Sequence, residues 1–187
     1  MTNCILGAGL AAALCLGGAP VAAKELAYVA SLKGRDAATS GDSGEAQIVV
    51  DSQARTVSVR ITVHHITLEQ LADNLVIASI GPIHFHLYPA HDHSSSANVT
   101  LLLPVSYGPN YAASADGFTV RMERYPYAQG AAALQSNQTF EQFVAAMDSG
   151  SVELNVHTDA YPQGQINGFI TPAPAPTKAR QRMRRRV

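Results

Sequence analysis

The chain has 187 residues, of which 47% are hydrophobic and none is tryptophan, and its formal net charge is −1. This length suits a single domain with one hydrophobic core of ordinary size. The two cysteines, Cys4 and Cys15, both lie near the N-terminus. Once that segment is removed, the protein has no disulfide, no thiol nucleophile and no thiolate ligand, which excludes blue-copper and cysteine-zinc sites.

Residues 1–23 form the first predicted element, a secretory signal. No charged residue precedes Lys24, and an apolar stretch around Cys4–Gly18 is followed by small residues at Val21 and Ala23. This pattern predicts cleavage near Ala23. The apolar run is too short and too rich in glycine and alanine for a transmembrane span. We therefore expect a secreted or periplasmic protein without a transmembrane span.

Residues 24–171 are dominated by a period of two, which is typical of β-strands. In the segment TVSVRITVHHI, valine and isoleucine alternate with polar residues. Strands are predicted at 25–32, 45–50, 56–66, 76–88, 97–107, 117–125, 151–159 and 164–170. Clusters of glycine, proline, asparagine, aspartate and serine separate them. The pattern predicts an all-β fold, an antiparallel β-sandwich or barrel.

Residues 138–150 break this pattern with apolar residues at helical spacing. Thr139 and Gln142 make a capping box and Gly150 ends the run, so one short helix is predicted to cover one end of the sandwich. A second helical turn is expected within residues 67–75. The segments 106–117 and 127–138, rich in glycine, alanine, serine and asparagine, are expected to be long loops.

Residues 172–187 differ in composition from the rest. Alternating proline and alanine predict a stiff linker. A basic tail then holds six of the 13 basic residues, namely Lys178, Arg180, Arg182, Arg184, Arg185 and Arg186. Residues 24–177 keep seven basic against 14 acidic residues. The tail is either disordered and solvated or an electrostatic attachment to an anionic surface, and without interleaved aromatic residues it does not indicate specific nucleic-acid recognition.

The stretch GPIHFHLYPAHDH, residues 81–93, holds four of the seven histidines. If 83–88 is a strand, His84 and His86 share the face that points away from the core, with the apolar residues on the other face. The same alternation in SVELNVHTD turns His157 outward. Outward histidines are either exposed or sheltered under a loop.

Two imidazoles in an H-x-H strand lie about 6–7 Å apart on one face, because a strand rises ~3.3 Å per residue. This separation suits two ligands of one metal ion, so His84 and His86 are candidate metal ligands. Further ligands are expected among His157, His91, His93 and His64. Imidazole-only sites suit copper and zinc. The shortage of carboxylates among the candidates favours copper, with zinc as the alternative.

Three residues near His157 are expected to orient ligand rings by hydrogen bonding, namely Glu153, Asn155 and Asp159. A homodimer joined through the histidine faces is also compatible with outward ligands.

The segment TFEQFVAAMDSGSVELNVHTDAYPQGQINGFI, residues 139–170, contains a capped helix, a strand ending in N-V-H-T, a P-x-G turn and a strand opening G-x-I-x-G. It resembles the C-terminal half of a chordin-type (CHRD) domain. The upstream segments ASLKGRDA and SGEAQIVVDSQARTVSVRITV resemble the family's opening strands, and IHFH stands where the family has H-I-H. The resemblance extends over about residues 26–171, so residues 24–171 are expected to form the domain.

The resemblance implies an antiparallel β-sandwich of immunoglobulin-like or superoxide-dismutase-like character. It also implies an extracellular location, because bacterial members are secreted and animal chordin is an extracellular antagonist of growth factors. The histidine strands also resemble the ligand strands of copper–zinc superoxide dismutases. That likeness implies His84, His86 and His157 as copper ligands, with His91 or His93 as the loop ligand. Two departures are that Gln165 and Asn167 replace the family's Glu and Arg, and that no late arginine is present to steer an anion.

Two functions are therefore open. The first is a secreted copper-binding protein for copper handling or, if it is an enzyme, a copper-dependent oxidoreductase similar to superoxide dismutase. The second is a non-enzymatic extracellular binding module whose histidines are surface residues and whose basic tail carries the interaction. No nucleophile-elbow pattern indicates a hydrolase.

Overall fold

The computed structural model describes residues 25–88 and 100–174 and contains one antiparallel sheet of ten strands. The strands are β1 (Glu25–Gly34), β2 (Ser43–Asp51), β3 (Thr56–His64), β4 (Ile83–Leu87), β5 (Thr100–Val105), β6 (Tyr111–Ser114), β7 (Gly117–Pro126), β8 (Val152–Val156), β9 (Ile166–Phe169) and β10 (Thr171–Pro172). Their order is β5-β4-β8-β9-β1-β2-β3-β7-β6, and β10 pairs with β1. The predicted all-β antiparallel fold is confirmed.

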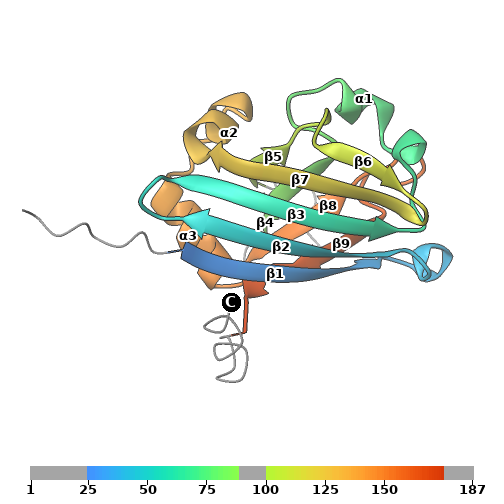
Figure 1. Ribbon diagram of the computed structural model, residues 1–187, viewed down its shortest axis with the longest axis horizontal. Coiled ribbons are helices and arrows are strands. Elements are labelled where there is room, and N and C mark those ends of the chain that lie inside the picture. The colour runs from blue at the N-terminus through green and yellow to red at the C-terminus, as the bar shows by residue number, and fades with distance from the viewer. Residues whose placement is uncertain (1–24, 89–99, 175–187) are drawn as a thin grey trace, which may run out of the picture.

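The sheet folds over into two layers (Figure 1). The front layer holds β1, β2, β3, β7 and β6, and the rear layer holds β5, β4, β8 and β9. The two layers are joined where β9 pairs with β1 at only two positions, Lys33 with Asn167 and Gly34 with Ile166. At the opposite edge the Tyr111 hydroxyl of β6 donates a hydrogen bond to the Val105 carbonyl of β5. The result is a closed, sandwich-like arrangement.

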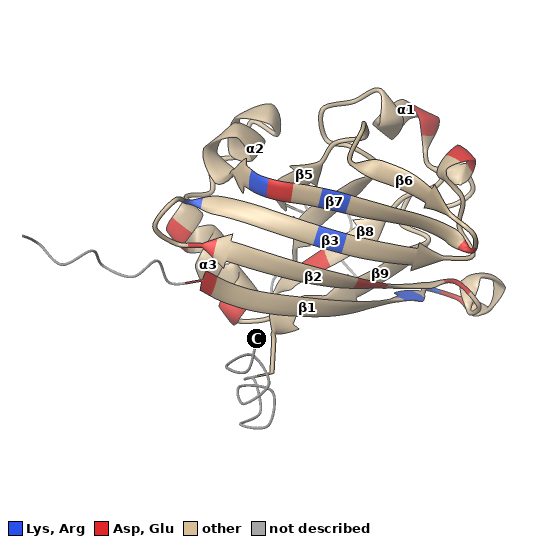
Figure 2. Ribbon diagram, in the orientation of Figure 1, with Lys and Arg blue, Asp and Glu red and all other residues tan. Residues whose placement is uncertain are grey.

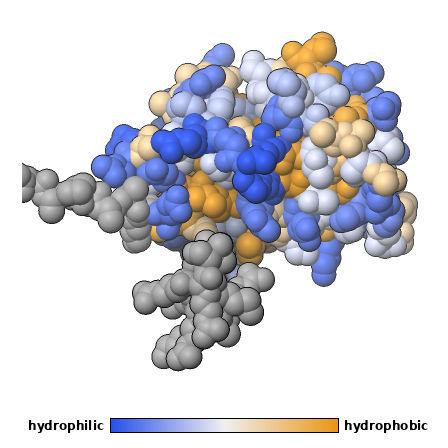
Figure 3. Space-filling model, viewed as in Figure 1, coloured by the Kyte–Doolittle hydropathy of each residue, from blue (hydrophilic) through white to orange (hydrophobic). Residues whose placement is uncertain are grey.

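The core lies between the two layers. Every second residue of a strand points inward and contributes its side chain to this core. In β2 and β3 this alternation is complete, with Ile48, Val50, Val57 and Val59 fully buried and less buried residues between them. Burying each such side chain stabilises the fold by roughly 1.5–3 kcal/mol. Figure 2 shows charged residues on β2, β3 and β7 of the front layer, and the space-filling view in Figure 3 shows hydrophilic residues across the middle of this face with hydrophobic ones beside them. Arg60 and Glu123 form an ion pair there across β3 and β7.

The predicted helix is confirmed as α3 (Phe140–Asp148). Its N-terminus is capped by Thr139 and Gln142, whose side chains and backbone N–H groups bond reciprocally. Phe143 is fully buried and lies against Phe85 of β4. The short helical turn expected within 67–75 is present as the 3-10 turn Leu68–Gln70 and α1 (Asp73–Val76).

Three segments differ from expectation. Strand β6 forms within 106–117, and the helix α2 (Tyr127–Ala133) forms within 127–138, where loops were predicted. The alanines of this segment favour a helix, and Gly130 lets it pack closely on β5, because a Cβ there would lie 2.9 Å from a Leu103 methyl. Of the predicted strand 76–88, only Ile83–Leu87 is extended. A further 3-10 turn covers Ala37–Thr39.

Several predictions fall on residues outside the described ranges, namely the signal at 1–23, His91, His93 and the basic residues from 178 onward. Residues 172–174 of the expected linker are described, and they extend the sheet, since Pro172 pairs with Tyr28 and the Ala173 N–H bonds to the Ala27 carbonyl. Among residues 25–88 and 100–174, no helix is long and apolar enough to cross a membrane.

Gly168 of β9 provides a test of how closely β9 approaches β1. A Cβ at this position would lie 2.2 Å from the Ser31 carbonyl oxygen, whereas a Cβ at Gly41 would meet nothing within 4 Å. Gly168→Ala is therefore expected to lower the free energy of unfolding by about 3 kcal/mol through overpacking, and Gly41→Ala by less than about 0.5 kcal/mol. Urea unfolding measures both, and equal effects would contradict the close contact.

Candidate metal centre

The pairing of β4 with β8 brings polar residues from both strands to one face. His84 lies opposite Asn155 and His86 opposite Glu153, while Phe85 between them lies opposite Leu154 and joins the hydrophobic core. His157 follows β8 directly, and its backbone N–H donates a hydrogen bond to the Pro82 carbonyl. The three histidines thus share the face of the rear layer that points away from the core, as the alternation predicted.

These three histidines are nevertheless buried. The exposed fractions are 3% for His84, 9% for His86 and 5% for His157. The alternative in which they are surface residues is therefore wrong for this trio. An imidazole buried in this way either has internal hydrogen-bond partners or is available to a ligand.

The three rings are packed against one another. The centroids of His84 and His157 lie 4.4 Å apart with the planes 12° from parallel, and those of His84 and His86 lie 4.7 Å apart. One ligand nitrogen from each ring lies within 4.8 Å of those from the other two. Within residues 25–88 and 100–174, these three histidines are the one group of at least three His, Cys, Asp or Glu side chains that is arranged so that it could hold a metal ion.

Backbone carbonyls orient two of the rings. His84 Nδ1 lies 3.0 Å from the Gly81 carbonyl oxygen, and His157 Nδ1 lies 2.9 Å from that of Pro162. A carbonyl only accepts, so both rings carry their proton on Nδ1 and keep a lone pair on Nε2. Among the residues that the structure describes, the Nε2 atoms of His157 and His86 are buried and have no hydrogen-bond partner. Rings held through Nδ1 with free Nε2 atoms are typical of metal-binding histidines.

Burial keeps the histidines neutral. Desolvation, together with the neighbouring His157, lowers the pKa of His84 to about 3. Desolvation is also the largest cause that lowers the pKa of His86 and of His157, and the positive charge of Arg35 contributes in both. Neutral imidazoles are the form that binds metals, so protons do not compete for these nitrogens near neutral pH.

A buried polar group adjoins the histidines. Asn155 Nδ2 lies 3.0 Å from His86 Nδ1 and 3.4 Å from a Glu153 carboxylate oxygen. Both residues are fully buried, and Arg35 comes within 4.0 Å of the same carboxylate. The expectation that Glu153 and Asn155 lie beside the histidines is confirmed. Arg35 was missed, because nothing in its local sequence indicates contact with a strand more than a hundred residues away.

Other candidates lie elsewhere. His64 ends β3 and its Nδ1 is 2.9 Å from an Asp116 oxygen, with His65 beside it, so the structure does not bring it into the trio. Asp159 accepts a hydrogen bond from the Asp73 N–H rather than contacting a ring. Gln165, which replaces a glutamate of the expected family pattern, bonds to Thr158 and Asp42.

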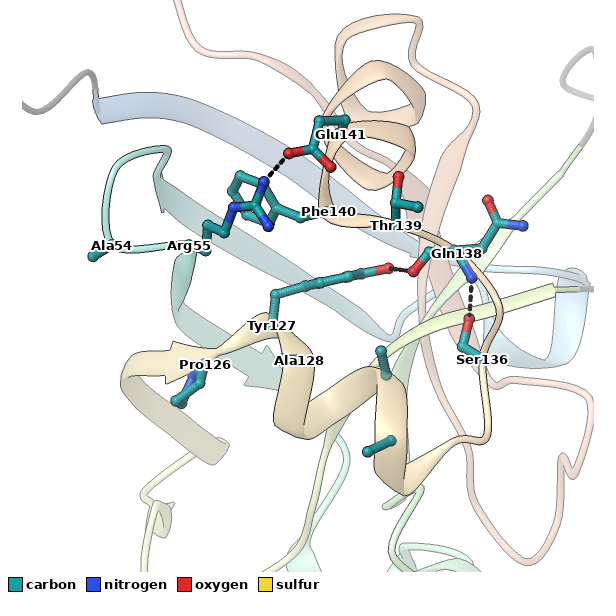
Figure 4. A pocket seen from close by; sticks show the side chains of 12 residues that line it. Ala54, Arg55, Pro126, Tyr127, Ala128, Ser136, Gln138, Thr139, Phe140 and Glu141 are labelled. Atoms are coloured by element: carbon teal, nitrogen blue, oxygen red, sulfur yellow. Dashed lines mark hydrogen bonds and ion pairs between the residues drawn. The ribbon is translucent and has the colours of Figure 1, made fainter.

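The pocket between α2 and α3 offers a contrast. It measures about 560 Å³ and is lined by Tyr127, Phe140 and several alanines. Figure 4 shows that its charged and hydroxyl groups make contacts, since Arg55 pairs with Glu141 and the Tyr127 hydroxyl donates to the Gln138 carbonyl. The histidine group, in which buried nitrogens lack partners, is therefore the better candidate site.

Comparison with known proteins gives one family. A model described as the CHRD domain matches residues 28–170. No curated protein and no solved structure matches. The matched span contains most of β1, all of β2 through β9, and the three histidines of the candidate centre.

The lowered pKa values predict an acid-sensitive metal-free protein. An unfolded histidine takes up a proton near pH 6.5, but the folded His84 does so only near pH 3. The stability that these neutral rings contribute is therefore complete above pH 6.5 and is lost as the pH falls below it, by up to about 1.4 kcal/mol per pH unit for each histidine. Urea unfolding of chelator-treated protein between pH 7.5 and 5 measures this slope.

The matched variants are His84→Gln, which should reduce the slope, and His65→Asn, which removes an exposed histidine and should leave it unchanged. His65 has a positive φ of 66°, a conformation that asparagine tolerates. A wild-type slope in His84→Gln would contradict the lowered pKa.

Proposed function

The chain belongs to the CHRD-domain family, and we propose that it is a copper-binding protein whose ligands are His84, His86 and His157. The observation that carries this proposal is the convergence of three buried imidazoles, two of them with an Nε2 atom that has no hydrogen-bond partner. A buried polar atom without a partner costs roughly 1–3 kcal/mol. A metal ion that accepts the Nε2 lone pairs of these rings, once His86 carries its proton on Nδ1, removes that cost.

Copper is favoured over zinc by the ligand set and by burial. All three donors are neutral imidazoles, and copper stands above zinc in the order of affinities for nitrogen ligands. Burying charge is expensive, so a singly charged cuprous ion suits this site better than a divalent ion. The nearby Glu153 carboxylate partly offsets the charge, but Arg35 approaches it at 4.0 Å and reduces that effect. Zinc is the alternative.

We place this activity outside the cytoplasm, in copper handling. The predicted signal at 1–23 and the absence of cysteine from the remaining chain support an exported, oxidation-resistant copper site. Three histidine ligands leave a further coordination position of the copper ion free, and His91 and His93 are candidates to fill it. If that position is open to a small oxyanion, the centre supports redox cycling similar to that of superoxide dismutase.

The first test is copper stoichiometry. Anaerobic titration with Cu⁺ against a competing chelator should give one ion per chain with a dissociation constant below micromolar. His84→Ala and His157→Ala should each lose this binding because two ligands remain, and His65→Asn should retain it. Affinity no better than micromolar, or unchanged affinity in both alanine variants, would overturn the proposal. Parallel titration with Zn²⁺ decides between the two metals.

The alternative function is attachment through the basic tail, favoured by the contrast between an acidic domain and six basic residues at its end. A protein that ends at Pro174 should then lose binding to vesicles containing anionic lipid, measured by co-sedimentation at low and physiological salt. It should keep full copper binding. If the shortened protein binds vesicles as well as the full chain does, the tail is not the attachment.

A further inference from the structure

Asn155 holds His86 differently from the way in which the other two rings are held. His84 and His157 each face a carbonyl through Nδ1. His86 Nδ1 instead faces Asn155 Nδ2 at 3.0 Å. An amide nitrogen donates, so His86 Nδ1 must accept, and the proton of the neutral ring then sits on Nε2. In the metal-free protein, His86 therefore has the opposite tautomer from its two neighbours.

This tautomer cannot bind a metal through Nε2, because that nitrogen carries a proton. The Nε2 atom of His86 is buried without a partner, and so is Asn155 Oδ1. Turning the Asn155 amide by half a turn places Oδ1 against His86 Nδ1. The ring then carries its proton on Nδ1, donates it to Oδ1, and frees the Nε2 lone pair for the ion.

Glu153 explains why the amide has its present orientation. Its carboxylate oxygen lies 3.4 Å from Asn155 Nδ2, and a carboxylate can only accept, so it favours the amide nitrogen on that side. Arg35 lies within 4.0 Å of the same oxygen and also bonds to the Gln163 carbonyl. A short approach of this guanidinium can replace the hydrogen bond that Glu153 loses when the amide turns.

Gly164 leaves space for the turned amide. A Cβ at this position would lie 3.0 Å from Asn155 Oδ1, and Gly164 has a positive φ of 100° that favours glycine. The residue beside Asn155 Oδ1 therefore has no side chain that could crowd the amide.

We infer that Asn155 is the positioning residue of this centre, and that metal binding reverses its amide and moves the His86 proton from Nε2 to Nδ1. The exchange is balanced, since one N–H bond breaks, one forms, and the ring stays neutral until Nε2 donates its lone pair to the ion. The inference rests on the proposed function for the identity of the ligands. It goes beyond that function because it assigns to Asn155 two amide orientations, one of which Glu153 stabilises in the metal-free protein.

The experiment is long-range ¹H–¹⁵N NMR of the full chain with labelled histidines, without metal and after anaerobic loading with Cu⁺, which is diamagnetic. The ¹⁵N shifts separate protonated from unprotonated ring nitrogens. Without metal, His86 should be protonated on Nε2, and His84 and His157 on Nδ1, so these two rings serve as internal references. With Cu⁺, all three should be protonated on Nδ1. His86 protonated on Nδ1 before metal is added would overturn the inference, as would Cu⁺ binding that leaves His86 unchanged.

Variants separate Asn155 from the other polar neighbour of His86, the Tyr88 hydroxyl at 3.5 Å. Glu153→Gln presents a donor to Asn155 and should shift metal-free His86 toward the Nδ1–H form. The Tyr88 hydroxyl also interacts with Asn155 and Arg35, so Tyr88→Phe should shift the tautomer less than Glu153→Gln does. A shift in Tyr88→Phe without one in Glu153→Gln would contradict the role of Glu153 in orienting the amide. Asn155→Leu should weaken Cu⁺ binding about 10- to 100-fold, whereas Asn110→Leu, in the turn before β6, should not.

Failure of this inference and failure of the proposed function give different results. If Cu⁺ binds to the three histidines but the His86 proton does not move, copper binding stands and the role of Asn155 falls. If Cu⁺ does not bind while metal-free His86 is protonated on Nε2, the proposed function falls and, with it, the metal-driven reversal, but the orientation of Asn155 is supported.

Discussion

The register between β4 and β8 is the constraint on which the centre depends. Because His84 lies opposite Asn155 and His86 opposite Glu153, four polar side chains are gathered on one patch of the rear layer. The residues between them, Phe85 and Leu154, complete the core on the other face. A slip of one residue would place every one of these groups on the wrong face. The hydrophobic core therefore enforces the register, and the register assembles the histidines.

Burial then determines the chemistry of the patch. Removal from water lowers the pKa of each histidine, so the rings are neutral donors rather than charged groups. It also makes each missing hydrogen bond costly, which is why Gly81 and Pro162 present their carbonyls to the rings. Nitrogens that still lack partners, in a structure that satisfies the polar groups of the pocket between α2 and α3, identify the place where a ligand is expected.

Membership of the CHRD family accounts for the fold, whereas the residues of this chain account for its particular centre. Gln165 stands where the family pattern has glutamate, and it links Thr158 to Asp42, so it ties the loop after β8 to the start of β2. The positive charge beside the centre comes from Arg35 at the end of β1, not from a late residue. Both contacts join the two layers of the sheet near the three histidines, which couples the loop after β8 to the front layer.

The sequence by itself determined the strand alternation, the capped helix α3 and the outward face of His84, His86 and His157, because these depend on local periodicity and capping. It did not predict β6 or α2, since the contacts that select them, such as Gly130 against Leu103, are distant in sequence. Only the tertiary structure decided that the outward histidines are buried and converge. The same holds for Arg35, which meets Gln163 across 128 positions of the chain. Burial and convergence depend on which strands become neighbours, and that is a property of the whole core rather than of any one segment.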